Sequence, residues 1–139
     1  MRIDQPALDE IAHHGEEGYP HEVCGIMIGP HGDDRVTEAR RARNTVVERA
    51  RDRYEMDPLD QIRVQRECDE RGMEVLGYYH SHPDHPAQAS ATDAGRSWAG
   101  WFYLIVSVTE GRAGDRNVFV AERDGGPMRP EPLEVVERR

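Results

Sequence analysis

The sequence contains no lysine, because all 18 of its basic residues are arginines. A chain without lysine cannot accept a protein modifier on a side-chain amine, which excludes it as a target of isopeptide conjugation through such an amine. With only two cysteines, Cys24 and Cys68, it lacks the framework of a disulfide-stabilised secreted domain, and a reduced, cytoplasmic location is expected. No apolar run approaches the roughly 20 residues that span a membrane, and residues 1–10 lack the apolar stretch of a signal peptide.

Apolar residues are also scarce, and acidic residues outnumber basic ones. Hydrophobic residues make up 37% of the chain, the mean hydropathy is −0.83 and the formal net charge is −9, which predicts a compact core beneath a heavily charged surface. Because an acidic chain repels phosphate groups, nucleic acid and anionic membranes are not expected partners. We interpret residues 1–139 as a single domain with a polar C-terminal tail from about residue 125. The composition leaves the oligomeric state open.

The most informative stretch is residues 80–93, with the sequence HSHPDHPAQASATD. It follows residues 73–79, whose apolar, β-branched and aromatic side chains are typical of a strand. Side chains two residues apart on a strand point the same way, so His80 and His82 can reach one ion. Pro83 has no N–H for a ladder hydrogen bond and is expected to end the strand.

Asp93 adds a carboxylate to this pair of imidazoles. In the segment SATD, Ser90 has the character of a helix N-cap and Asp93 falls in the first turn. Two imidazoles and a carboxylate leave a fourth tetrahedral position open, which is the arrangement of a catalytic rather than a structural zinc. The pair of histidines and the Ser90–Asp93 segment each have a simpler interpretation. The histidines can be ordinary core or surface residues, and Asp93 can cap the backbone donors of a helix.

A general base need not lie nearby in the sequence. Glu22, in HEVCGIMIG at the start of another apolar run, is the best candidate. A carboxylate close to zinc-bound water can take its proton, and the metal lowers the pKa of that water from roughly 16 to about 7. These residues together support the hypothesis of a zinc hydrolase.

The same residues resemble the JAMM metallopeptidases, also called the MPN or Mov34 family. The family pattern is a distant Glu, here Glu22, then H-[ST]-H-P, here residues 80–83, then a loop of the usual length and S-x-x-D, here Ser90 to Asp93. Further segments are similar to the small bacterial branch, so that the resemblance covers roughly residues 1–125. These segments are EVCGIMIG at 22–29, RYEMDP at 53–58 and GYYHSHP at 77–83.

The resemblance implies an α/β fold in which a single-domain mixed β-sheet is flanked by helices, in the three-layer manner of cytidine deaminases. It implies that His80, His82 and Asp93 bind Zn²⁺, with water as the fourth ligand. Glu22 would take the proton of that water and deliver it to the leaving amine. Ser90 would donate a hydrogen bond to the tetrahedral oxyanion.

The small bacterial branch includes enzymes that act on ubiquitin-like (β-grasp) sulfur-carrier proteins. They release cysteine from the carrier's C-terminus or trim residues beyond a terminal Gly-Gly, so such a carrier is the expected substrate, with its tail extended beside a strand edge. Two alternatives stay open: a peptidase of the same mechanism that acts on another peptide or ubiquitin-like tail, and a non-catalytic MPN scaffold. The carrier, the pathway and the native metal also stay open, since iron or cobalt would suit similar ligands.

Other candidate residues have less specific interpretations. Cys24 could face the metal if its strand is regular from Glu22 onward, but a small buried hydrophobic residue is the simpler expectation. His85 lies in the loop beside the site and is expected to be exposed, with substrate contact left open. The histidines at 13–14 are expected at the surface. The run ARRAR at 39–43 is most simply a solvated face, although it could meet an acidic partner.

Periodicity and helix or strand breakers predict the elements along the chain. The expected helices are residues 3–17, residues 58–71 between an Asp57 N-cap and Gly72, and a short helix after Asp93 that carries Trp98. The expected strands are residues 23–28, 35 to about 47, 54–56, 73–82, 101–108, 117–122 and 133–136, with turns at 31–34 and 111–115 and a loop at 125–132.

Overall fold

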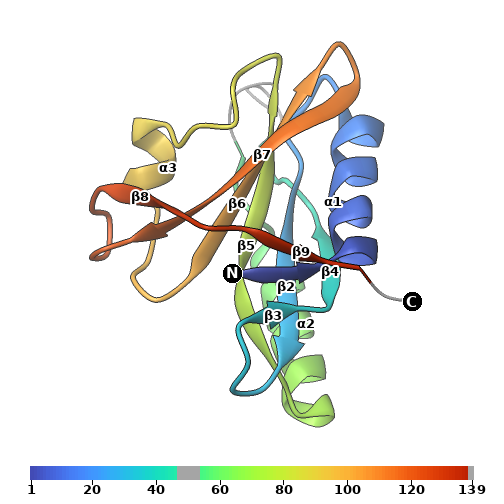
Figure 1. Cartoon of the computed structure of the whole chain (residues 1–139), viewed down its shortest axis with the longest axis vertical. Helices are drawn as coiled ribbons and strands as arrows, with labels where there is room; N and C mark the ends of the chain where they lie inside the picture. Colours follow the sequence, from blue (N-terminus) through green and yellow to red (C-terminus); the bar gives the residue numbers. More distant parts are fainter. Residues whose placement is uncertain (47–53, 138–139) are drawn as a thin grey trace.

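Residues 1–46 and 54–137 are described by a computed structural model, in which they form two β-sheets and three helices (Figure 1). The large sheet has six strands in the order β4-β2-β5-β6-β7-β8, and the small sheet has three in the order β3-β1-β9. The strands are β1 (Arg2–Asp4), β2 (Cys24–Pro30), β3 (Arg35–Val36), β4 (Glu38–Ala42), β5 (Met73–Pro83), β6 (Phe102–Thr109), β7 (Arg112–Ala121), β8 (Met128–Glu131) and β9 (Glu134–Val136). The helices are α1 (Gln5–Gly18), α2 (Pro58–Arg71) and α3 (Ala91–Gly95).

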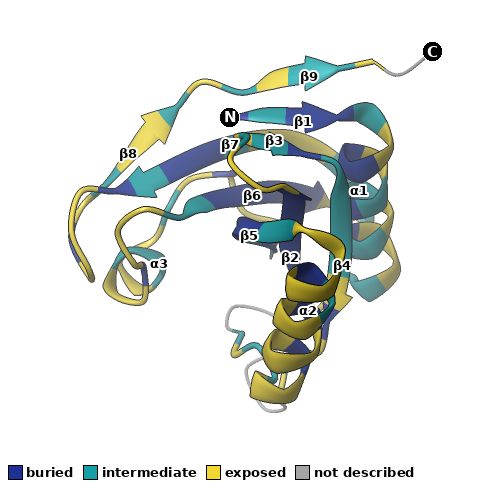
Figure 2. Cartoon of the chain, turned by 90° about the horizontal axis from the view of Figure 1, so that it is seen from below, coloured by how far each residue is buried: buried dark blue, intermediate teal, exposed yellow. Residues whose placement is uncertain are grey.

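The large sheet is mixed and has helices on both faces. β2 runs antiparallel to β4 and β5, β5 and β6 are parallel, and β6, β7 and β8 follow antiparallel. Figure 2 shows α1 and the small sheet over one face and α2 and α3 on the other. A mixed sheet flanked by helices is the predicted fold class, which is confirmed. Among the described residues, no helix is long and apolar enough to cross a membrane.

Each face of the large sheet has its own apolar core. The main core joins α1 and the small sheet to the large sheet, and a second core joins α2 to the opposite face. A third, smaller cluster forms where the loop after β5 covers β6 and β7. Its buried members are Ala87, Ile105 and Phe119. The central strands are therefore covered on both faces, which explains why their sequences are nearly continuous apolar runs.

Sequence signals mark both ends of α2 as predicted. The Asp57 side chain accepts a hydrogen bond from Leu59 N at 2.9 Å, and Pro58 occupies the first turn. Gly72 ends the helix in the left-handed conformation, with φ of 67°. Cys68 of α2 is buried against the large sheet.

Several predicted boundaries are wrong because strand pairing overrides local signals. Residues 2–4 form a strand rather than the start of α1, since they pair with β3 and β9. Residues 54–56 are not a strand, and only an isolated bridge joins Met56 to Asn44. The strand expected from residue 35 to about residue 47 is divided into β3 and β4 and ends at Ala42, while residue 47 lies outside the described residues.

Two further predictions near the end of the chain need correction. α3 ends at Gly95 and does not carry Trp98, whose exposure is 61%; five residues provide no apolar face that would extend the helix over the core. The turn predicted at 111–115 is a shorter turn at Glu110 and Gly111, which have φ of 50° and 81°. Positive φ at both positions suits a two-residue hairpin turn, so β7 begins immediately after it.

The C-terminal stretch contributes strands to both sheets. The loop predicted at 125–132 contains β8, which pairs with β7 at the edge of the large sheet. Pro130 is accommodated there because an edge strand leaves one row of backbone groups unpaired. The edge strand predicted at 133–136 is confirmed as β9, which pairs in parallel with β1.

A β-bulge in β5 decides which of its side chains face α2. Two consecutive residues of β2 pair with Val75 and Gly77, so Leu76 is an extra residue in the ladder. Leu76 packs into the main core, whereas Val75 and Tyr78 both pack against the α2 core. Strict alternation would place Val75 and Tyr78 on opposite faces. The bulge therefore sets the orientation of every later residue of the strand.

Candidate metal centre

His80 and His82 lie at the end of β5 and point to the same face of the large sheet, as the H-x-H spacing predicts. Their Nε2 atoms are 3.2 Å apart, and His80 is only 1% exposed. The strand ends at Pro83, as expected, although Pro83 still lies in the ladder opposite Val108. The parallel pairing of β5 with β6 thus holds both imidazoles on a rigid central strand.

Asp93 approaches both imidazoles from α3. Its Oδ1 lies 3.1 Å from His80 Nε2 and its Oδ2 lies 3.2 Å from His82 Nε2. The same carboxylate completes a capping box, in which Ser90 N donates to Asp93 Oδ2 at 2.8 Å and Asp93 N donates to Ser90 Oγ at 3.0 Å. The capping and ligand interpretations of Asp93 are therefore compatible, because the cap holds the carboxylate where it faces the histidines.

The spacing of these three groups suits a small tetrahedral ion. Zinc bonds of about 2.0–2.1 Å require ligand atoms about 3.3 Å apart, close to the 3.1–3.2 Å separations found between the two Nε2 atoms and the carboxylate of Asp93. His82 Nδ1 donates to Pro86 O at 2.9 Å, which leaves the Nε2 lone pair of His82 available for a ligand bond. His80 Nδ1 is buried and has no hydrogen-bond partner in the described part of the chain.

The electrostatics of the cluster favour a bound cation. Burial by itself raises the pKa of the Asp93 carboxyl, but the hydrogen bonds with His80 and His82 outweigh burial and hold that pKa well below its usual range. Burial lowers the pKa of His80, which favours the neutral imidazole. Burial by itself lowers the pKa of His82, but its hydrogen bonds with Asp93 and Pro86 O raise that pKa, so His82 must lose its Nε2 proton before it can bind zinc beside the ionised Asp93.

Glu22 reaches the cluster from the segment just before β2. Val23 N donates to Ser81 Oγ at 2.9 Å and Ser81 N donates to Val23 O at 3.1 Å, while Asn44 Nδ2 donates to Glu22 O at 3.1 Å. These bonds fix the backbone around Glu22, which is only 5% exposed. One carboxylate oxygen of Glu22 and one ring nitrogen from each of the two predicted histidine ligands all lie within 4.8 Å of one another. Ser81, the middle residue of HSH, therefore ties the candidate base to the ligand strand.

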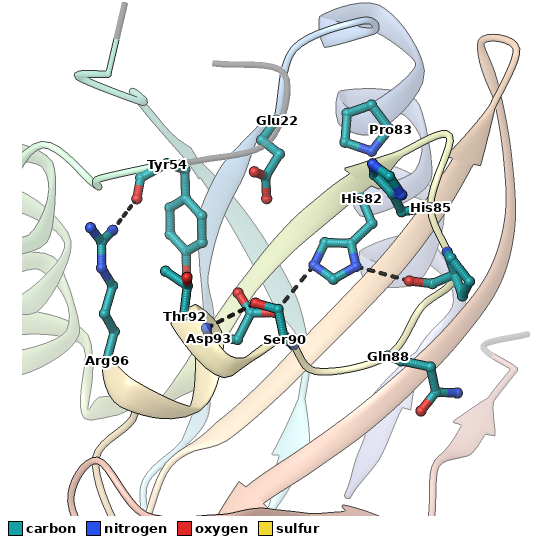
Figure 3. A pocket seen from close by; sticks show the side chains of 11 residues that line it. Glu22, Tyr54, His82, Pro83, His85, Gln88, Ser90, Thr92, Asp93 and Arg96 are labelled. Carbon is teal, nitrogen blue, oxygen red and sulfur yellow. Dashed lines mark hydrogen bonds and ion pairs between the residues drawn. The ribbon is translucent and has the colours of Figure 1, made fainter. Parts of the chain in front are cut away.

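These groups open into a cavity of about 340 Å³ (Figure 3). Tyr54 and Arg96 lie at one side of it, and His85 and Gln88 lie at the other. The Tyr54 ring stacks on the imidazole of His80 with centroids 4.7 Å apart, and Arg96 donates to Tyr54 O at 2.5 Å. Tyr54 and Arg96 also line a neighbouring cavity of about 520 Å³ with an aromatic wall. Sequence reasoning assigned neither residue a role, although Tyr54 lies in the RYEMDP segment.

The remaining candidate residues lie outside the ligand cluster. Cys24 is fully buried, its Sγ donates to Arg43 O at 3.8 Å, and burial raises the pKa of its thiol to about 12, so the expectation of a small buried residue is confirmed. His85 is exposed, as expected, but it lines the cavity. His14 is half-buried rather than at the surface, because α1 directs its ring against Tyr79 on the other face of the sheet.

The arginines of ARRAR are engaged within the chain. Arg40 forms an ion pair with Glu67 of α2, and Arg41 pairs with Glu10 and Glu17 of α1 at 2.5 and 2.6 Å. These contacts tie β4 to the helices on the two faces of the large sheet. The run is thus a set of surface ion pairs between elements rather than a purely solvated face.

The fold and the converging nitrogen and oxygen atoms place the chain among the JAB-domain proteins. It belongs to the family of prokaryotic homologues of the JAB domain, whose family model matches residues 4–121. This match confirms the resemblance to the JAMM/MPN proteins that the sequence motif indicated.

Individual relatives are also similar along most of the chain. The chain is 39% identical over 112 residues to the desampylase of Haloferax volcanii, spanning 77% of this chain and 80% of that protein. It is 29% identical over 133 residues to the CysO-cysteine peptidase of Mycobacterium tuberculosis, spanning 94% of this chain and 88% of that protein.

Solved structures share the fold. A protein from Desulfitobacterium hafniense has a TM-score of 0.82 at 26% identity, covering 99% of this chain and 94% of that chain. A JAB1/MPN domain protein from Archaeoglobus fulgidus has a TM-score of 0.63 at 21% identity, covering 99% of this chain and 97% of that chain. At that identity the second likeness concerns the fold alone.

Proposed function

We propose that this chain is a zinc-dependent metallopeptidase that hydrolyses a peptide or isopeptide bond at the C-terminus of a ubiquitin-like sulfur-carrier protein. The observation that carries the proposal is the convergence of two Nε2 atoms and one carboxylate within 3.2 Å of one another, with the buried carboxylate of Glu22 beside them. His80, His82 and Asp93 would hold the ion. A bound Zn²⁺ supplies Lewis acidity toward a scissile carbonyl and lowers the pKa of a coordinated water.

Glu22 is placed to act as the general base and then the general acid. Its carboxylate faces the cavity near His82 (Figure 3), and the side chain is buried. It would take a proton from the attacking water and deliver that proton to the leaving nitrogen. The backbone contacts through Ser81 and Asn44 would keep the carboxylate within reach of both atoms.

Ser90 is placed to stabilise the oxyanion. Its Oγ already accepts the hydrogen bond from Asp93 N at 3.0 Å, so its own hydroxyl proton can be donated into the cavity that Ser90 lines. A substrate carbonyl oxygen that becomes negatively charged would receive this hydrogen bond. The acceptor function in the helix cap and the donor function toward substrate therefore use different parts of one hydroxyl group.

The substrate class is supported by the relatives and by the form of the site. The names desampylase and CysO-cysteine peptidase belong to proteins similar to this chain over most of its length. Glu22, His82, Ser90 and Asp93 all line the cavity, so a chain terminus that enters it would reach them. Glycines next to the scissile bond would let the backbone approach His82 and Glu22 closely.

Intact mass spectrometry of a sulfur carrier that ends in Gly-Gly-Cys tests the proposal. After incubation with the zinc-loaded chain, we expect the carrier to lose one cysteine residue, and we expect no loss with Glu22→Gln. An isopeptide-linked carrier conjugate, incubated in parallel, distinguishes release of a terminal residue from deconjugation. Full zinc occupancy without cleavage of either substrate would contradict the sulfur-carrier assignment and direct attention to other peptide tails.

A non-catalytic MPN scaffold is the alternative from a different class. Such scaffolds typically lack some of the ligands, whereas all the candidate ligands are present here and within bonding range of a shared ion. Measured zinc content separates the two possibilities. A chain purified with full access to Zn²⁺ that retains almost none would favour the scaffold.

A further inference from the structure

The loop that connects the candidate ligands on β5 and α3 is tied to the sheet by two side chains that no step of the proposed mechanism uses. Ser107 on β6 donates its hydroxyl hydrogen to His85 O at 2.6 Å. Asn117 on β7 donates through Nδ2 to Ala87 O at 2.8 Å. These two carbonyls lie on either side of Pro86, whose own carbonyl accepts the hydrogen bond from His82 Nδ1 at 2.9 Å.

The register of the sheet places both side chains beneath the loop. Ser107 pairs directly with His82 across β5 and β6, and Asn117 pairs with Ile105 across β6 and β7. The neighbours of these residues on the same face are apolar, because Ile105 packs with Phe119 and Ala87 under the loop. Ser107 is only 8% exposed, so its hydroxyl group has a specific partner rather than solvent.

We propose that Ser107 and Asn117 are positioning residues for the metal ligand His82. By fixing the carbonyls of His85 and Ala87 to β6 and β7, they hold the Pro86 carbonyl against His82 Nδ1. That contact keeps the proton on Nδ1, directs the ring and leaves Nε2 free as the ligand atom. The inference rests on the metal site of the proposed function. It adds residues of β6 and β7, which carry no candidate ligand, to the groups that support that site.

Hydrogen bonds made by the loop's own residues join this segment less firmly to β6 and β7. Asp84 N donates to Val108 O at 2.8 Å and Asp84 Oδ1 accepts from Glu110 N at 2.9 Å, which secures the first residue of the loop, whereas Gln88 N donates to Pro86 O at 2.8 Å within the loop itself. The segment that carries the carbonyl facing His82 begins two residues later. Ser107 and Asn117 reach that segment, so their loss would release it while its beginning stays anchored.

Zinc affinity of the full chain tests the proposal without reference to hydrolysis. Competition with a chromophoric chelator would give the dissociation constant of Zn²⁺ for the unmodified chain, Ser107→Ala and Asn117→Ala. Mutation of a group that holds a metal ligand typically weakens metal affinity by about 10–100-fold. Because Ser107 and Asn117 act through an intervening carbonyl, we expect each alanine variant to bind Zn²⁺ about 10-fold more weakly. Ser107→Thr keeps the hydroxyl group and is expected to restore affinity to within about threefold of the unmodified chain.

Val118→Ala is the matched control for general loss of stability. Val118 neighbours Asn117 on β7, but it is buried in the main core on the other face of the sheet. This substitution should lower the urea midpoint of the metal-free chain without weakening Zn²⁺ binding by more than about twofold. If Val118→Ala weakens Zn²⁺ binding as much as Asn117→Ala does, the loss follows from stability and the positioning role is overturned.

The affinities also separate this inference from the proposed function. If the unmodified chain binds no Zn²⁺, the proposed metallopeptidase and the positioning role fail together. If the unmodified chain binds Zn²⁺ tightly and both alanine variants bind within twofold of it, the positioning role alone is overturned. Weaker binding by both variants, with restoration by Ser107→Thr, supports the role whichever substrate the chain cleaves.

Discussion

Single side chains in this molecule serve two purposes at once, and Ser90 and Asp93 show this most directly. Asp93 caps α3 through Ser90 N and also faces both candidate histidine ligands. The helix cap thereby supplies the fixed geometry that an open three-ligand site requires. At the scale of the residue, the local structure and the proposed chemistry cannot be altered independently.

Replacing Glu22 by Gln should abolish turnover while leaving metal binding nearly intact. The amide keeps the shape of the side chain but cannot accept a proton, so we expect kcat to fall by about 10²–10⁴-fold. Steady-state kinetics and elemental analysis of bound zinc measure the two effects. Glu55→Gln, at the rim of the neighbouring cavity, is the control and should keep its activity. A Glu22→Gln variant that turns over normally would remove the general base from the mechanism.

Ser90→Ala removes both the proposed oxyanion donor and the acceptor in the cap of α3. We expect kcat to fall by about 10²–10³-fold with a small change in KM, because the donated bond forms only as negative charge develops. Ser90→Thr keeps the hydroxyl group and should recover most of the activity. A rise in KM with unchanged kcat would assign Ser90 to substrate binding instead.

At the scale of the element, β5 contributes both to the core and to the candidate site. It is central in the large sheet, contains the bulge at Leu76 and presents both histidines after it. The bulge permits Val75 to pack beneath α2 while the later residues keep the orientation that the candidate site needs. The strand is therefore a structural element of the core and the support of the site at the same time.

Gly77→Ala tests how closely β5 must approach β6. A Cβ at this position would lie 2.0 Å from the backbone oxygen of Phe102, so the two strands would have to separate. We expect the free energy of unfolding of the metal-free chain to fall by at least about 2 kcal/mol, measured by urea denaturation. Gly114→Ala on β7 is the matched control, since no atom lies within 4 Å of its added Cβ. Equal stability of the two variants would refute the close-packing argument.

At the scale of the whole molecule, many charged side chains form ion pairs between secondary-structure elements. The net charge is −9, yet arginines on β4 reach acidic residues of α1 on one face and of α2 on the other. Such exposed pairs each contribute little to stability in water, at most about 1 kcal/mol. Together they place the positive charge of β4 against the acidic side chains of the helix on each face of the large sheet.

His14 predicts a pH dependence of the stability of the fold. Its Nδ1 lies 2.7 Å from Tyr79 Oη, and burial, followed by the nearby charge of Arg41, lowers its pKa from 6.5 to about 4. Between these values the unfolded chain binds a proton that the folded chain does not, so stability falls as the pH falls from about 6.5 toward 4. His14→Gln removes the titrating imidazole and therefore its contribution to the pH dependence of stability.

Urea midpoints of the metal-free chain and of His14→Gln, measured at pH 7.5, 6 and 5, test this expectation. Carboxylates and the other histidines titrate in both proteins, so the difference between the two curves isolates His14. We expect the unmodified chain to lose more stability than His14→Gln as the pH falls. Parallel curves would show that His14 titrates normally in the folded chain.

Much of the architecture could be predicted from local patterns. The apolar run at 101–108 predicted the central strand β6, and Asp57 with Pro58 and Gly72 predicted both ends of α2, because the caps and breakers act through neighbouring backbone groups. Predictions failed where pairing partners are distant. Residues 2–4 and 128–131 are strands only because other strands lie beside them.

The sequence by itself determined the candidate ligands and their local arrangement, since alternation along a strand aligns His80 with His82 and a capping box fixes Asp93. Only the tertiary structure decided that Glu22 lies beside these residues, because its neighbour Val23 is hydrogen-bonded to Ser81. It also decided that Ser107 of β6 and Asn117 of β7 contact the loop between β5 and α3. The physical reason is the range of the interactions. Helix caps and side-chain alternation depend on adjacent residues, whereas the register of β2 on β5 and of β6 on β7 depends on packing of the whole sheet.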